Sequence, residues 1–194
     1  MIGKIYLAGP EVFLPNMPSI FAAKIKLCAD YKFGVTLPSE ADREKLSTLP
    51  PSEKSAFIYT INIKSMHEAD FGIFNLTPFR GPSADVGTVF ELGFMAGLGK
   101  PVFGYTNVPS DYLERITPRQ ETIPQPNSPP SLYNFNDANG WGIEDHGNAD
   151  NLMIDETLNR SVAPLVRHTA PLPERLEDLT AFKACLEQAA TKLG

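Results

Sequence analysis

Two short apolar runs, Phe71-Gly-Ile-Phe-Asn-Leu76 and Pro101-Val-Phe-Gly-Tyr105, enclose the segment Gly87-Thr-Val-Phe-Glu-Leu-Gly-Phe-Met-Ala-Gly-Leu98. The outer runs are bounded by turn residues, which is typical of buried β-strands. The middle segment is predicted to be a helix that ends at Gly99, because glycine readily adopts the left-handed conformation that follows many helices. Strand, helix and strand in this order predict parallel strands joined by a right-handed crossover.

The same alternation extends along the chain in both directions. Residues 4–8 predict a strand that stops at Gly9-Pro10, and Asn16 begins a predicted helix that runs to about residue 31. The other predicted elements are a strand at 35–37 after Gly34, a helix at 52–69 with Ser52 as its N-cap, a helix at 151–158, a strand at 163–167 and a helix at 172–193. The sequence thus predicts an α/β fold in three layers, with a mostly parallel five-stranded sheet and ligands at the carboxyl ends of its strands.

Composition excludes several classes of protein. The chain has 194 residues with 17 Lys+Arg against 23 Asp+Glu, a net charge of −6, which suits a single domain covering residues 1–194. An acidic chain without a run of basic residues is not expected to bind a nucleic-acid polymer. Its apolar runs fall well short of the roughly 20 residues that span a membrane. Because the N-terminus lacks the pattern of a signal peptide, we expect a cytoplasmic protein.

Residues 107–148 differ from the rest of the chain. Prolines occur there at positions 109, 118, 124, 126, 129 and 130, among many Asn and Asp residues, and this composition predicts a long loop or insertion. Elsewhere, Cys28 and Cys185 lie far apart, each in a helical pattern, and are expected to be buried free thiols. The histidines do not cluster either, so no metal site is expected.

Asp85 and Glu91 are the candidates for chemistry. They lie six residues apart across the junction between a predicted loop and the following helix, so both can face one crevice. Paired carboxylates in different environments supply a nucleophile and a proton donor at neutral pH. The local alternative is structural, because Thr88-Val-Phe-Glu91 matches a helix capping box and Asp85 suits a turn. Gly81 and Gly87, which permit tight turns, favour the catalytic alternative.

Several motifs together resemble those of the nucleoside 2-deoxyribosyltransferase family. They are Ile5-Tyr6-Leu-Ala-Gly9-Pro10, Ala69-Asp70, Asp85-x-Gly87-Thr88-x-x-Glu91-Leu-Gly93-x-x-Ala96, Gly99-Lys100-Pro101-Val102 and Asn151-Leu152-Met153. The resemblance implies a flavodoxin-like sheet, a homo-oligomer, and transfer of 2-deoxyribose between nucleobases. It implies that Glu91 is the nucleophile, that Asp85 exchanges a proton with the base, and that Tyr6 holds Glu91 by a hydrogen bond. From its sequence position alone, Tyr6 would instead be a core tyrosine.

The resemblance also implies contacts with the substrate. Gly9 in the first motif is expected beside it, and Asn151 with Met153 is expected to reach the site of a neighbouring subunit, although Asn151 also suits a helix N-cap. Asn62 stands where some family members have an aspartate, so it adds a hydrogen-bond donor there.

Phe13 and Phe79 follow the first and third predicted strands and are candidates to sandwich the base, with core packing as the alternative.

The predicted reaction is a double displacement through a deoxyribosyl-Glu91 intermediate, with deoxynucleosides and free nucleobases as partners and neither a metal nor an organic cofactor. Loss of a base suits an oxocarbenium-like transition state, which a carboxylate stabilises and traps. One alternative is a 2-deoxynucleoside 5′-monophosphate N-glycosidase; Asp85 argues against it, whereas Ser83 and Arg80 leave it open. Another is a non-catalytic nucleotide-binding module, in which Glu91 only caps a helix.

Overall fold

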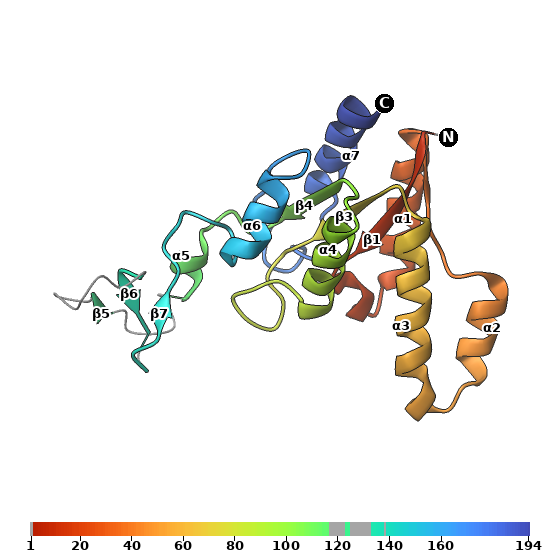
Figure 1. The fold of residues 1–194 in the computed structure, drawn as a ribbon, viewed down its shortest axis with the longest axis horizontal. Coiled ribbons are helices and arrows are strands. Elements are labelled where there is room, and N and C mark those ends of the chain that lie inside the picture. Colours follow the sequence, from red (N-terminus) through yellow and green to blue (C-terminus); the bar gives the residue numbers. More distant parts are fainter. Residues whose placement is uncertain (1, 117–122, 125–132, 138) are drawn as a thin grey trace.

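A single parallel sheet organises the chain (Figure 1). The computed structural model describes residues 2–116, 123–124, 133–137 and 139–194. The sheet has the strand order β2-β1-β3-β4-β8, and each neighbouring pair is parallel. The strands are β1 (Gly3–Ala8), β2 (Phe33–Val35), β3 (Phe71–Asn75), β4 (Val102–Thr106) and β8 (Val166–Arg167). Among these strands the order is 2-1-3-4-5, that of flavodoxin-like folds, which confirms the predicted fold class.

Helices cover both faces of this sheet. Helices α1 (Met17–Asp30) and α7 (Thr180–Leu193) pack on one face, where Cys28, Phe182 and Cys185 join the core. Helices α3 (Pro51–Glu68), α4 (Val86–Gly97) and α6 (Leu152–Asn159) pack on the other face. Three further helical segments are η1 (Pro10–Phe13), α2 (Glu40–Thr48) and α5 (Tyr112–Ile116). The predicted three layers are therefore present.

The alternation of side chains along β1 decides which residues reach each layer. Successive strand residues point to opposite faces. Ile5 and Leu7 belong to the core under α1 and α7, whereas Tyr6 and Ala8 belong to the core under α3, α4 and α6. Tyr6 is thus directed toward the helices that carry Asn62 and Glu91.

Two predicted boundaries in the first half are wrong. Strand β2 occupies residues 33–35 rather than 35–37, because Lys32, and not Gly34, adopts the left-handed turn after α1 with φ 63°. Phe33 is then buried and pairs with Gly3. Ser52 is not an N-cap, since it lies inside α3, which begins at Pro51.

The C-terminal elements are shorter than predicted. The last helix begins at Thr180 rather than at residue 172, and residues 172–177, which follow Pro171 and include Pro173, form turns. Leu172 is 77% exposed there, so it adds nothing to an apolar helix face. Strand β8 is confined to Val166–Arg167, because Pro164 lacks the N–H that a strand within the sheet would donate.

Part of the predicted loop or insertion at residues 107–148 has regular structure. It contains α5 and a small antiparallel sheet of β5 (Ile123–Pro124), β6 (Phe135–Asn136) and β7 (Gly142–Ile143). These elements lie at one end of the molecule, beyond α6 (Figure 1). Residues 117–122, 125–132 and 138 of this segment lie outside the described residues. Elsewhere, Cys28 and Cys185 are both buried, as predicted. None of the described helices combines the length and apolar character needed to cross a membrane.

Candidate active site at the start of helix α4

The position of Glu91 in α4 excludes a helix-capping role. The helix begins at Val86, and its N-cap is Asp85, whose Oδ2 accepts hydrogen bonds from the N–H and the hydroxyl of Thr88, both at 3.0 Å. The alternative in which Thr88 and Glu91 form a capping box is therefore wrong, since Thr88 is already inside the helix. Glu91 falls in the second turn, where the backbone N–H groups are bonded within the helix.

Two side chains from other elements hold the Glu91 carboxylate. The Tyr6 hydroxyl, from β1, donates to Oε1 at 2.6 Å, and the Asn62 amide, from α3, donates to the same oxygen at 3.2 Å. Among the described residues, no hydrogen bond reaches Oε2 of Glu91. Tyr6 and Asn62 thus fix the orientation of the Glu91 carboxylate through one of its two oxygens.

Burial raises the pKa of Glu91 above its ordinary value. The hydrogen bond from Tyr6 opposes this shift, the negative charge of Asp85 adds to it, and the Asn62 hydrogen bond again lowers the pKa. Asp85 and Glu91 are thus carried by the same end of α4, as the N-cap and in the second turn. Burial, together with the charge and hydrogen bond of Glu91, raises the pKa of Tyr6 far above its usual range. Tyr6 therefore keeps its proton and remains a donor to Glu91.

Gly9 and the turn after it lie at the carboxyl end of β1. A Cβ on Gly9 would clash with the Glu11 carboxylate and would come within 2.6 Å of the Asn75 side chain. Glu11 is buried and forms an ion pair with Lys24, and it also accepts a hydrogen bond from Asn75 at 2.8 Å. Glycine at this position thus lets the chain turn closely over the ends of β1 and β3.

Phe13 and Phe79 meet at the end of the same strands. Their rings are stacked, with centroids 5.3 Å apart and planes inclined by 9°. Because the rings contact each other, a base does not fit between them in this arrangement, but the pair presents an aromatic surface, with Phe13 54% exposed. Arg80 lies over both rings, 5.1 Å from the centroid of Phe13 and 4.7 Å from that of Phe79. Arg80 itself adopts a left-handed backbone conformation, with φ 56°.

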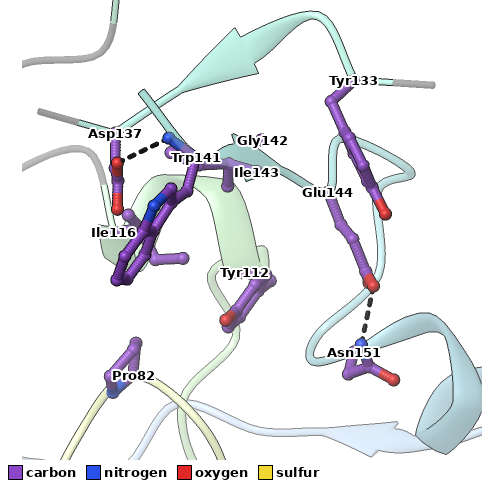
Figure 2. Close-up of a pocket in the computed structure, with 10 residues that line it drawn as sticks. All are labelled: Pro82, Tyr112, Ile116, Tyr133, Asp137, Trp141, Gly142, Ile143, Glu144 and Asn151. Atoms are coloured by element: carbon purple, nitrogen blue, oxygen red, sulfur yellow. Dashed lines mark hydrogen bonds between the residues drawn. The ribbon is translucent and has the colours of Figure 1, made fainter. Parts of the chain in front are cut away.

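Asn151 has the local role that its position suggested. Its Oδ1 accepts the N–H of Met153 at 3.0 Å and caps α6, while its Nδ2 donates to Glu144 at 2.6 Å (Figure 2). Met153 is 67% exposed and borders a groove of about 360 Å³ between α4 and α6. Among the described residues, no hydrogen bond joins Asn151 or Met153 to Glu91. These two residues therefore face a different side of α4 from the Glu91 cluster.

The described residues contain no group of three or more His, Cys, Asp or Glu side chains arranged to hold a metal ion. The chemistry available at α4 is that of two carboxylates, a tyrosine hydroxyl and an amide.

The chain is similar to several known proteins. A 2-desoxiribosyltransferase from Leishmania mexicana has a similar fold, with a TM-score of 0.65, 22% identity and 97% of both chains covered. A 2-deoxyribosyltransferase from Bacillus psychrosaccharolyticus is 27% identical over 53% of this chain and 71% of its own, with a TM-score of 0.38. Uncharacterized protein C191.05c of Schizosaccharomyces pombe is 37% identical over 113 residues, 58% of this chain, so the match spans about half (54%) of that relative.

The family itself is shown by a sequence model rather than by any one relative. That model matches residues 5–153, a range that includes Tyr6, Asn62, Asp85 and Glu91. The chain belongs to the nucleoside 2-deoxyribosyltransferase family.

Proposed function

We propose that this protein transfers 2-deoxyribose between nucleobases through a covalent bond to Glu91. The observation that supports this most directly is the Glu91 carboxylate, which Tyr6 and Asn62 both hold by Oε1 while Oε2 forms no hydrogen bond among the described residues. A carboxylate that served only as a helix cap would bind backbone N–H groups at the start of α4, where Asp85 is found instead.

The first half of the reaction breaks the glycosidic bond. Oε2 of Glu91 attacks C1′ of the deoxyribose as the bond from C1′ to the base nitrogen breaks, and the base leaves with that electron pair. Asp85 gives a proton to the departing base. This step forms an ester between C1′ and Glu91.

The second half reverses these roles. The nitrogen of an incoming base attacks C1′, the bond between C1′ and Glu91 breaks, and the carboxylate takes back its electron pair. Asp85 accepts the proton that the incoming base loses. Two inversions at C1′ give overall retention, and both side chains return to their starting states.

Transfer to a base requires that water be kept away from the ester. We propose that a second copy of the chain contributes to this, as a homo-oligomer. Val86 is 84% exposed on α4 and Met153 is 67% exposed on α6, and both line the groove between these helices. Apolar side chains exposed in one groove are typical of protein interfaces.

The function is tested by incubating the protein with deoxyinosine or thymidine, with and without adenine, and separating the products by chromatography. We expect deoxyadenosine that requires both adenine and Glu91, so Glu91→Ala is inactive. Glu53→Ala, which removes an exposed carboxylate from α3, is the control and should retain activity. Free base released equally without adenine would favour a hydrolase, and deoxynucleoside monophosphates would then be tested because Arg80 lies beside the aromatic pair. No reaction with any donor would leave a nucleotide-binding module.

A further inference from the structure

A buried ion pair lies between two segments that are far apart in the sequence. Arg115 in α5 is 3.6 Å from Asp150, and their side chains are 10% and 3% exposed. The Arg115 guanidinium donates to the carbonyl of Pro82 at 2.8 Å, to that of Ser110 at 2.6 Å, and to that of Ala149. One arginine therefore joins the loop before α4 to the segment before α6.

Asp150 joins the same two segments through its two oxygens. Its Oδ2 accepts the N–H of Ala84 at 2.8 Å, and its Oδ1 accepts the N–H of Asn151 at 2.8 Å. Ala84 directly precedes Asp85. A single buried carboxylate thus holds the backbone beside Asp85 and the backbone of Asn151.

The segment that carries Asp150 is itself fixed from the other side. Asp155 in α6 accepts the N–H groups of Ala149 and Asp150, each at 3.0 Å. By contrast, the loop before Asp85 has no helix or strand of its own, and one turn bond, from the Phe79 N–H to the Ser83 carbonyl at 3.0 Å, closes it internally. Asp85 is thus held by its own hydrogen bonds to Thr88 and by the contacts that the 149–150 segment and α5 make with the loop before it.

We propose that Asp150 and Arg115 are positioning residues that hold Asp85 in place for proton transfer and couple it to Asn151. The proposal rests on the function given above, in which Asp85 protonates the departing base.

Asp150→Asn tests this with little change in shape. The substitution replaces one acceptor oxygen by an NH₂ group, so the side chain no longer accepts from both Ala84 and Asn151. It also removes the negative charge beside Arg115. General acid catalysis contributes about 10²- to 10⁴-fold to a rate, so we expect a loss of at least about tenfold with a donor whose base must be protonated.

The choice of donor separates a positioning role from general damage. Deoxyinosine needs a proton on its departing base, whereas 7-methyl-2′-deoxyguanosine already carries a positive ring charge and leaves without one. We expect Asp150→Asn to lose activity with deoxyinosine and to retain most of it with the methylated donor, as Asp85→Asn should. Arg160→Gln, which removes an 80% exposed arginine on the surface, is the control and should lose neither activity. Equal losses with both donors, or no loss with either, would overturn the proposal.

A second readout does not depend on catalysis. The Ala84 N–H is protected by a buried acceptor, so hydrogen exchange there should be faster in Asp150→Asn than in the wild-type chain. Unchanged exchange at Ala84 would contradict the proposed coupling. If Asp150→Asn fails to fold, Arg115→Lys replaces it as the test. Lysine keeps the positive charge but lacks the planar guanidinium that bonds three carbonyls. We again expect activity to be lost with deoxyinosine and largely retained with the methylated donor. A wild-type chain inactive with both donors would overturn the proposed function and the role in proton transfer, while exchange at Ala84 would still report on the ion pair.

Discussion

Replacing Tyr6 by phenylalanine removes one hydroxyl from the candidate site and leaves the ring in the core. The Tyr6 hydroxyl lies 2.6 Å from Oε1 of Glu91, and it lowers the pKa of that carboxylate against the effect of burial. If Glu91 is the nucleophile, activity requires its ionised form, and kcat/KM therefore rises as the pH increases through the Glu91 pKa. Because the hydroxyl stabilises the ionised form, its loss raises the pKa and moves the acid limb of the profile to higher pH.

The size of the shift follows from the kind of hydrogen bond. A hydrogen bond to a charged group contributes about 1.5–3 kcal/mol. Since about 1.4 kcal/mol corresponds to one pH unit, the acid limb of Tyr6→Phe should move upward by about 1–2 pH units. In Tyr6→Phe, the Glu91 carboxylate still accepts one hydrogen bond, from Asn62 at 3.2 Å to the same oxygen.

The assay is the pH dependence of kcat/KM for transfer from 7-methyl-2′-deoxyguanosine to adenine, because the base of this donor leaves without a proton from Asp85. Tyr31→Phe is the matched control, because Tyr31 also donates to a glutamate, Glu187 at 3.0 Å, but on the exposed face of α7. Its profile should coincide with that of the wild type. An acid limb of Tyr6→Phe that stays in place, or that moves to lower pH, would refute the assignment of Glu91 as the ionised nucleophile held by Tyr6.

Four further predictions concern stability, electrostatics and assembly. Glu91→Gln should abolish transfer, yet at neutral pH its melting temperature should equal or exceed that of the wild type. The reason is that the pKa of Glu91 is raised in the folded protein. The stability that Glu91 contributes is therefore present below its pKa in the unfolded chain and is lost as the pH rises through its pKa in the folded protein. A lower melting temperature would favour the capping alternative. Asn62→Asp should move the acid limb to higher pH, because it replaces a donor by a second negative charge, and an unchanged profile would contradict this. Lys24→Met should lower the free energy of unfolding, measured in urea, by about 3–5 kcal/mol, because it leaves Glu11 without its ion-pair partner at 2% exposure. Adding Glu11→Gln should recover part of this loss. A loss near zero would be inconsistent with the buried pair. Val86→Asp should yield monomers in analytical ultracentrifugation, whereas a wild-type monomer would rule out the proposed assembly.

Residues 71–105 show how much of the fold is readable from sequence. Two buried strands around an apolar helix leave few alternatives to a parallel βαβ unit, and the register from Gly72 opposite Val102 to Asn75 opposite Tyr105 bears this out. Buried strands of a parallel sheet are apolar along their whole length, so the pattern that identifies them is continuous.

Helix α2 was not predicted because it buries nothing. None of its nine residues is buried, so no apolar stripe marks it. The signal that was available is the capping box at its start, in which Ser39 and Asp42 exchange hydrogen bonds. The opposite error occurred at Thr88, where a matching pattern forms no box because the helix had already begun.

Part of the candidate site could be predicted from the alternation of side chains along a strand. The alternation along β1 directs Tyr6 toward the α3 and α4 layer, so its contact with Glu91 agrees with the pattern of that strand. The stacking of Phe13 on Phe79 and the ion pair of Arg115 with Asp150 depend on how loops distant in sequence fold against each other. Local patterns carry no information about such contacts. Phe13 and Phe79 were expected to enclose a base rather than to stack on each other, and Arg115 and Asp150 were not predicted to have a role.

The most direct test of the central claim is to look for deoxyribose bound to Glu91. The protein is incubated with deoxyinosine in the absence of an acceptor base, quenched in acid, digested and analysed by tandem mass spectrometry. We predict a deoxyribosyl adduct on the peptide that contains Glu91, which disappears as deoxyadenosine forms when adenine is added before the quench. Transfer to adenine that persists in Glu91→Ala, or an adduct on a different residue, would contradict the assignment of Glu91 as the nucleophile.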